Sequence, residues 1–142
     1  MSNKFEFKKY YVISPGVSHD RIYDLRERTA RFGEEIIDFV KSLKRDEVSR
    51  PLIGQIVRSG TSIGANYMEA DGAESKKDFY HKIALSRKEA KETEHWLRMI
   101  KRANPEQSDG SKCLSQEAHE LALIFSSILS SKKESVRNRN SK

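Results

Sequence analysis

Residues 79–100 carry the pattern that most restricts the fold of this chain, a repeat of apolar and small side chains at alternating steps of four and three. This spacing keeps every repeated position on one face of an α-helix and matches the seam along which coiled-coil helices pack. Small side chains at three of the positions imply close packing against a neighbour. We therefore predict one long helix over residues 75–103, begun by Ser75 as N-cap. The repeat comprises Phe79, Ile83, Ser86, Ala90, Thr93, Leu97 and Ile100.

Three further segments, at about residues 20–44, 51–72 and 114–132, also carry apolar stripes at helical spacing. The segment 51–72 is nearly free of charge, with Arg58 alone between Pro51 and Met68, so we expect it to be surrounded by protein. Gly60 and Gly64 are costly in an exposed helix, and we expect them to permit close approach of a neighbouring helix. Four amphipathic helices with short connections predict an all-α, antiparallel up-down-up-down four-helix bundle over residues 20–132.

The two ends of the chain lie outside this bundle. Residues 1–19 are predicted to form an N-terminal arm, whose aromatic and β-branched side chains (Phe5, Phe7, Tyr10, Tyr11, Val12 and Ile13) either make a short strand or pack on a neighbour. Residues 133–142 have almost no apolar side chains and are predicted to be a disordered basic tail. The basic ends either contact anionic partners or are simply solvated, and both alternatives stay open.

Composition removes several classes of protein. With 142 residues the chain is one ordinary domain, and its seven glycines and three prolines argue against a turn-rich β protein. The single cysteine, Cys113, excludes an internal disulfide framework and a cysteine-based zinc cluster. No apolar run is long enough to span a membrane, and the N-terminus lacks the apolar core of a signal peptide. We therefore expect a cytoplasmic protein with no membrane partner.

Positive charge is concentrated on the predicted helix 75–103. The chain has 27 Lys and Arg against 21 Asp and Glu, and residues 74–102 hold nine bases and five acids. At ~100° per residue, eight of the nine bases fall on one arc outside the core seam, and Lys82 lies elsewhere. A mixed solvated face would hold about as many acids as bases, so we interpret the arc as a nucleic-acid-binding surface, with a solvated face as the alternative. The arc comprises Lys76, Lys77, Arg87, Lys88, Lys91, Arg98, Lys101 and Arg102.

The same helix has a third sector with apolar side chains outside the seam. Leu85, Trp96 and Met99 lie there beside two glutamates. A bundle helix needs only about 100° of apolar surface, so this surplus predicts an oligomer interface. The alternative is that Trp96 packs at the rim of its own bundle.

A polar strip runs along the segment 51–72. Arg58, Ser62, Asn66 and Glu69 follow one another at helical spacing, with opposite charges at the two ends. We interpret the strip as a structural hydrogen-bonded feature that ties helices or subunits together, because buried polar groups need partners. A ligand-binding role is the alternative.

No set of residues predicts catalysis, a cofactor or a metal. Glu92 and His95 have the spacing of a di-iron ligand pair, but the similar pair Asp78 and His81 lies ~21 Å away on the same helix. The glycine- and hydroxyl-rich segment 60–64 lacks the lysine of a phosphate-binding loop, and Cys113 with His119 is a weak nucleophile–base pair. We expect a protein that is not an enzyme.

These residues also carry a resemblance to a known family. The segments 58–70 (RSGTSIGANYMEA), 88–97 (KEAKETEHWL) and 23–29 (YDLRERT), together with 73–75 (AES), Asp78-Phe79 and Lys82, resemble the signature of a bacterial four-helix-bundle family. This family includes proteins encoded by intervening sequences within 23S ribosomal RNA genes and the accessory protein of diversity-generating retroelements. The resemblance covers roughly residues 22–132, and the arm and the tail fall outside it.

The resemblance implies a four-helix protomer that assembles into a homopentamer. It implies, for the retroelement branch, a basic pentamer that binds nucleic acid and a reverse transcriptase, whereas the role of the intervening-sequence branch is poorly defined. It implies no catalytic residue, and it does not say whether Arg58, Ser62, Asn66 and Glu69 serve packing or binding.

Together the residues and the resemblance predict a non-catalytic, oligomeric nucleic-acid-binding bundle, with RNA favoured over DNA only through the family. The alternative is a protein-interaction scaffold whose basic face meets an acidic protein surface.

Overall fold

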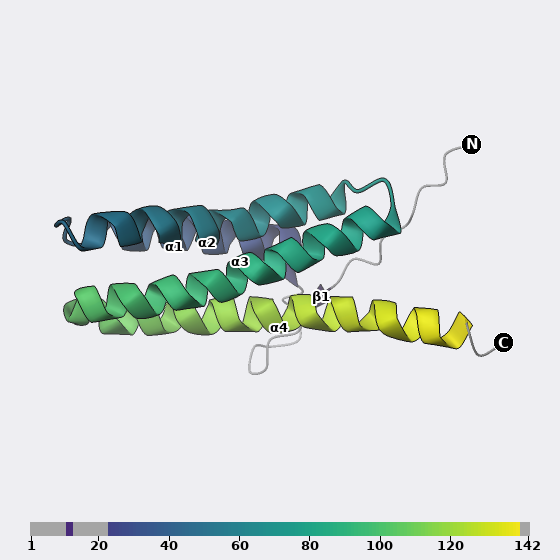
Figure 1. Cartoon of the computed structure of the whole chain (residues 1–142). Helices are drawn as coiled ribbons and strands as arrows, with labels where there is room; N and C mark the ends of the chain where they lie inside the picture. Colours follow the sequence, from purple (N-terminus) through teal and green to yellow (C-terminus); the bar gives the residue numbers. More distant parts are fainter. Residues whose placement is uncertain (1–10, 13–22, 140–142) are drawn as a thin grey trace.

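The computed structural model describes residues 11–12 and 23–139. Two short strands, β1 (Tyr11–Val12) and β2 (Tyr23–Asp24), pair antiparallel ahead of the helices. The helices are α1 (Leu25–Lys41), α2 (Ser49–Asp71), α3 (Lys76–Ala103) and α4 (Ser108–Arg139), and a 3-10 turn, η1 (Pro105–Gln107), precedes α4. Successive helices reverse direction, as Figure 1 shows, so the predicted all-α up-down-up-down bundle is confirmed.

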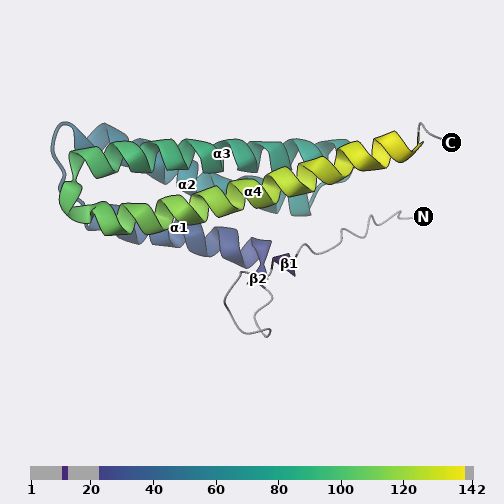
Figure 2. The same cartoon turned by 90° about the horizontal axis from the view of Figure 1, so that it is seen from below.

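The helices pack as two layers, with α1 and α2 in one and α3 and α4 in the other (Figure 1). Seen from below in Figure 2, α4 runs across the bundle and its last turns extend beyond the end of the neighbouring helices. Arg28 joins α1 to α4, because its guanidinium donates to both Glu117 and Glu120 of α4 at 2.6–2.9 Å. Within the described residues, no helix is long and apolar enough to cross a membrane.

Short polar side chains begin three of the helices. Asp24 Oδ1 accepts from the Arg26 amide at 2.9 Å and Ser75 Oγ accepts from the Asp78 amide at 3.1 Å, so each satisfies an otherwise unpaired N–H of a first turn. For α2 the acceptor is Asp46, whose Oδ1 takes the amides of Val48 and Ser49 at 3.1 and 2.8 Å. Since Asp24 caps α1, that helix begins at Leu25 and not at about residue 20.

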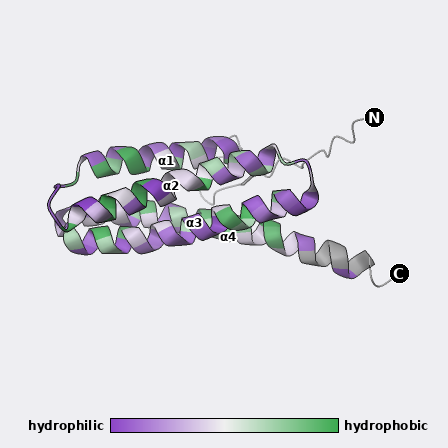
Figure 3. Cartoon of the chain, turned by 45° about the horizontal axis from the view of Figure 1, so that its top comes forward, coloured by the Kyte–Doolittle hydropathy of each residue, from purple (hydrophilic) through white to green (hydrophobic). Residues whose placement is uncertain are grey.

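The predicted seam of α3 is its buried face. All seven repeat positions are buried, and Figure 3 shows the alternation of hydrophilic and hydrophobic stretches along each helix that one buried face produces. Two small polar members of the seam reach α2: Ser86 Oγ donates to the Ile63 carbonyl at 3.1 Å, and Thr93 Oγ1 donates to Ser59 Oγ at 3.0 Å. The seam therefore joins α3 to α2 by hydrogen bonds as well as by apolar contact.

Two glycines of α2 mark where α1 crosses closely. A Cβ on Gly60 would stand 2.9 Å from Ile36 Cγ1, and a Cβ on Gly64 would stand 3.3 Å from the Thr29 carbonyl oxygen. Ordinary contacts with a Cβ are longer, so neither site has room for a side chain without a shift of α1. The predicted close approach of a neighbouring helix is confirmed.

The last helix begins earlier than the predicted start at about residue 114. Pro105 begins η1, and α4 starts at Ser108. Gly110 does not break the helix; a Cβ there would lie 2.9 Å from Phe39 Cε2, so glycine lets the first turn of α4 pack against α1. Asn104, which is 2 % exposed, joins the C-terminal end of α3 to the first residue of α2 by donating to Ser49 Oγ at 3.2 Å.

The two ends of the chain are described only in part. Tyr11 and Val12 form β1, as the strand alternative for the arm predicts, whereas Phe5, Phe7, Tyr10 and Ile13 lie outside the described residues. The prediction ended the last helix at about residue 132, but α4 continues to Arg139, so residues 133–139 of the predicted tail are helical. Residues 140–142 lie outside the described residues.

Candidate nucleic-acid interface

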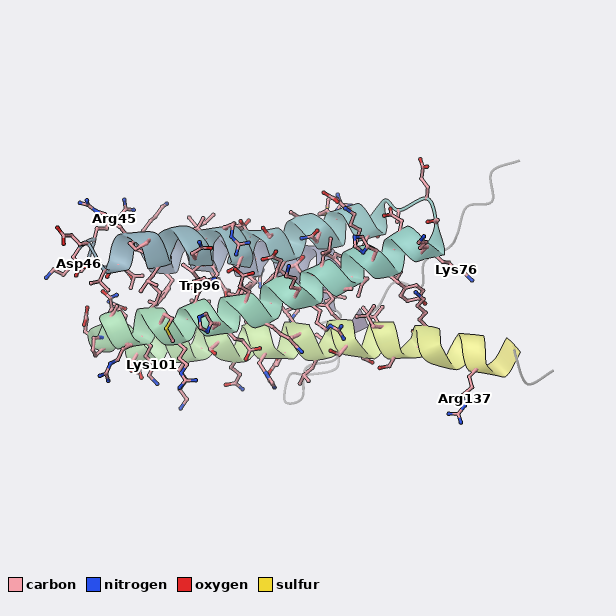
Figure 4. All side chains as sticks on the ribbon, viewed as in Figure 1. Arg45, Asp46, Lys76, Trp96, Lys101 and Arg137 are labelled. Atoms are coloured by element: carbon pink, nitrogen blue, oxygen red, sulfur yellow. The ribbon has the colours of Figure 1, made fainter. Side chains whose placement is uncertain are left out.

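All eight predicted bases lie on α3, along its outer surface. Seven are exposed and Arg87 is half-buried. Lys76 and Lys101, labelled in Figure 4, mark the approximate ends of this row, and from Lys76 to Arg102 it spans about 39 Å at ~1.5 Å rise per residue. We call these eight residues the basic stripe.

Three of the four acidic side chains of α3 pair with neighbouring helices, and the fourth, Asp78, lies in its first turn. Glu89 and Glu92 both pair with Arg58 of α2, at 3.2 Å in the case of Glu89, and Glu94 pairs with His119 of α4, whose Nδ1 lies 3.3 Å away. The one base outside the stripe, Lys82, pairs with Glu69 of α2. The three glutamates of α3, which could neutralise the stripe, are thus paired with residues of α2 and α4.

Most members of the stripe have no such partner among the described residues. In the part of the chain that the structure describes, seven of its members make no ion pair within 4.0 Å. Like charges on one surface repel unless an anion neutralises them, so the stripe has the electrostatics of a polyanion-binding surface. The seven are Lys77, Arg87, Lys88, Lys91, Arg98, Lys101 and Arg102.

A groove runs beside the stripe, between the C-terminal half of α3 and the first turns of α4. Its volume is about 690 Å³, and the sequence pattern did not reveal it because its second wall comes from α4. Arg98 and Lys101 of the stripe line it together with Lys112, a base that lies just before the predicted start of the last helix. Its other lining residues are Glu94, His95, Leu97, Ser111, Ser115, Gln116 and His119.

Two members of the polar strip, Arg58 and Glu69, join α2 to α3, whereas the choice between a structural and a ligand-binding role stays a prediction. Arg58 and Glu69 do not pair with each other; they pair across to α3, with Glu89 and Glu92 in one case and with Lys82 in the other. Between them, Asn66 Nδ2 donates to the Ser62 carbonyl at 2.9 Å, and Ser62 Oγ donates to the Arg58 carbonyl.

The three residues of the predicted oligomer interface are half-buried within one protomer. Trp96 packs against the core cluster and its Nε1 donates to Glu92 Oε1 at 3.0 Å, which is the rim packing weighed as the alternative. In Figure 4 Trp96 lies on the edge of α3 next to α2, opposite to Lys101. Leu85 and Met99 are not part of the core cluster. The oligomer interface of Leu85, Trp96 and Met99 stays a prediction.

Among the residues that the structure describes, three titratable groups have shifted pKa values, and all three take part in contacts that hold the fold. A hydrogen bond to Glu117 raises the pKa of Arg28, against the opposing effect of burial. A hydrogen bond to Glu69 raises the pKa of Lys82, and the hydrogen bond from the Ser49 amide lowers the pKa of Asp46. These shifts report ion pairing and helix capping and not catalytic tuning.

The residues tested above for chemistry are occupied in other ways. Glu92 accepts from Trp96 and pairs with Arg58, so it is not held ready for a metal beside His95. Cys113 is exposed, and His119 contacts Glu94. Among the described residues, no group of three His, Cys, Asp or Glu side chains is placed to hold a metal ion.

Comparison with known proteins adds a family to this geometry. The model of a family described as 23S rRNA-intervening sequence protein matches residues 22–127. The chain belongs to this family. A crystal structure from Bacteroides thetaiotaomicron, described as a protein with unknown function from the S23 ribosomal protein family, is 32% identical and has a TM-score of 0.65. The match covers 74% of this chain and 97% of that one.

No curated protein matches the chain. The match of the family model to residues 22–127 confirms the resemblance to the 23S rRNA-intervening sequence family, which was predicted over roughly residues 22–132. The link to the retroelement accessory protein stays a prediction.

Proposed function

We propose that this member of the 23S rRNA-intervening sequence family is a non-catalytic, oligomeric nucleic-acid-binding protein that acts through the basic stripe of α3, with RNA as the favoured partner. The observation that carries the proposal is the segregation of charge on α3. Three of its four acids, Glu89, Glu92 and Glu94, are paired with neighbouring helices. Seven bases of the stripe make no ion pair within the described residues, and six of these seven are exposed.

The mechanism is neutralisation of phosphates. Each Lys or Arg that contacts a phosphate releases a condensed counterion, and the entropy of release drives binding. A stripe of about 39 Å is comparable to one turn of duplex, which rises by about 34–36 Å. Because the sequence contains no recognisable base-reading motif, the expected binding depends on salt and not on base sequence.

Charge reversal within the stripe tests the proposal. Lys88→Glu with Lys91→Glu should weaken binding of labelled RNA and duplex DNA and should lower the log–log salt slope by about 1.4–1.8, since each lost contact contributes about 0.7–0.9. The matched control is Lys41→Glu with Lys44→Glu, which changes the charge equally at exposed residues at and just beyond the C-terminal end of α1. Equal binding by the two double variants would contradict the assignment to α3.

The proposal includes assembly, because a ring repeats the stripe and multiplies weak contacts. We expect a native mass of about five times the 16.4 kDa of the chain. Trp96→Asp should reduce the mass to that of a monomer, and Met99→Glu, outside the core cluster, should do the same with less harm to the protomer. An unchanged mass in both variants would exclude this face as the interface.

A reverse transcriptase is the protein partner that the retroelement resemblance adds to the proposal. Its test is co-purification with a reverse transcriptase encoded beside this chain's gene. The competing scaffold function predicts another result, namely capture of an acidic protein without any affinity for nucleic acid.

A further inference from the structure

The groove between α3 and α4 has features that phosphate neutralisation alone does not need. Arg98, Lys101 and Lys112 line it from both walls, against a single carboxylate, Glu94, that is already 3.3 Å from His119 Nδ1. The groove therefore has a net positive charge. Its volume of about 690 Å³ falls within the ~300–1,000 Å³ of sites that enclose small organic molecules, the size class of a nucleotide.

The other lining groups suit a nucleobase. The rings of His95 and His119 lie on the rim, and exposed aromatic or imidazole rings are surfaces on which unpaired bases stack. His95 packs edge-on against Trp96, with ring centroids 5.0 Å apart and planes at 71°, so its ring is held in place. Ser115 and Gln116 offer hydrogen-bonding groups to a base edge, and Leu97 supplies an apolar floor.

One polar group of the groove is unsatisfied. Ser111 is 2 % exposed, and its Oγ is the single buried side-chain polar atom without a hydrogen-bond partner among the described residues. Buried hydroxyls are nearly always paired in native proteins. Because Ser111 lines the groove, its hydroxyl leaves one hydrogen-bonding group unused in the groove wall.

We infer that this groove holds a single nucleic-acid strand, with phosphates on Arg98, Lys101 and Lys112 and an unstacked base against His95. The inference rests on the proposed nucleic-acid function and deepens it by naming the form of the ligand. A duplex is convex and keeps its bases stacked inside, so it reaches the outer stripe only, whereas a single strand has bases free to enter.

The first test compares two histidines of the same helix. His95→Ala should lower the affinity for a labelled 12-nucleotide single-stranded RNA about 5-fold or more, the usual effect of losing one stacked base, and should change the affinity for a matched duplex less than 2-fold. His81→Ala is the control, because His81 is exposed on α3 but does not line the groove. Equal single-strand binding by the two variants would overturn the inference.

The second test concerns the charge that α4 contributes. Lys112→Gln should lower the single-strand salt slope by about 0.7, whereas Lys41→Gln, an equal change on α1, should leave it unchanged. Photocrosslinking of the wild-type protein to an RNA that carries 4-thiouridine needs no variant, and it should label peptides within residues 94–119. Labels found only outside that range would overturn the inference.

The outcomes separate the two claims. If Lys88→Glu with Lys91→Glu weakens binding while His95→Ala and Lys112→Gln do not, the groove inference fails and the proposed function stands. If the wild-type protein binds neither RNA nor duplex at low salt, both fail.

Discussion

Replacing single glycines of α2 with alanine tests the helix crossing on which the bundle depends. At Gly60 the new Cβ would stand 2.9 Å from Ile36 Cγ1 and 3.1 Å from Cγ2, and Ile36 is fully buried. At Gly54, six residues earlier, nothing lies within 4 Å of the new Cβ. Alanine gains about 1 kcal/mol over glycine in a helix at either position. Overpacking a core costs about 1–3 kcal/mol and applies to Gly60 alone.

We therefore expect Gly54→Ala to be more stable than the wild type, and Gly60→Ala to be about 1–3 kcal/mol less stable than Gly54→Ala. Thermal unfolding at equal protomer concentration measures the difference, about 3–12 °C at roughly 3–4 °C per kcal/mol for a chain of this size. Adding Ile36→Ala should cost less in the Gly60→Ala background than in the wild type, since the clashing atoms are removed. Equal stability of the two alanine variants would refute the close crossing.

Two further predictions concern the ion pairs and caps that hold the helices. Arg28→Met should reduce the free energy of unfolding by about 1–3 kcal/mol, because the Arg28 side chain, 10% exposed, no longer donates hydrogen bonds to Glu117 and Glu120. Denaturant unfolding measures the loss, and Arg28→Lys should lose less stability than Arg28→Met. Asp46→Ala should lower the unfolding midpoint at neutral pH, because Asp46 caps α2. Its pKa is lowered below the usual 3.8 in the fold, so the advantage of the wild type is full above pH 3.8 and should vanish as the pH falls through the lowered pKa. An unchanged difference at pH 2 would contradict the capping role.

Much of the bundle is predictable because one helix carries its own pattern. All seven seam residues of α3 are buried, from Phe79 to Ile100, since periodicity within one helix needs no knowledge of its neighbours. The same holds for the basic stripe, whose members share a helical arc whatever packs beside them. Ser75 was recognisable as a cap because an N-cap acts within a few residues.

Which side chains of two different helices meet was not predictable. Glycine is typical of loops, yet Gly110 lies in α4. Phe39 of α1 packs where a side chain at position 110 would stand. Arg58 and Glu69 have opposite charges on one helix, but each finds its partner on α3. The groove could not be predicted for the same reason, because Lys112 and Arg98 line one surface only after α3 and α4 pack together.

Binding of nuclease-treated protein to labelled single-stranded RNA and duplex DNA across a salt series tests the central claim most directly. The account predicts affinity that falls steeply and linearly on a log–log plot, with a slope of several units, at about 0.7 per phosphate contact for RNA and 0.9 for the duplex, and with little dependence on base sequence. Absence of binding even at low salt would contradict it, and would leave the basic stripe as a surface for solvent or for an acidic protein.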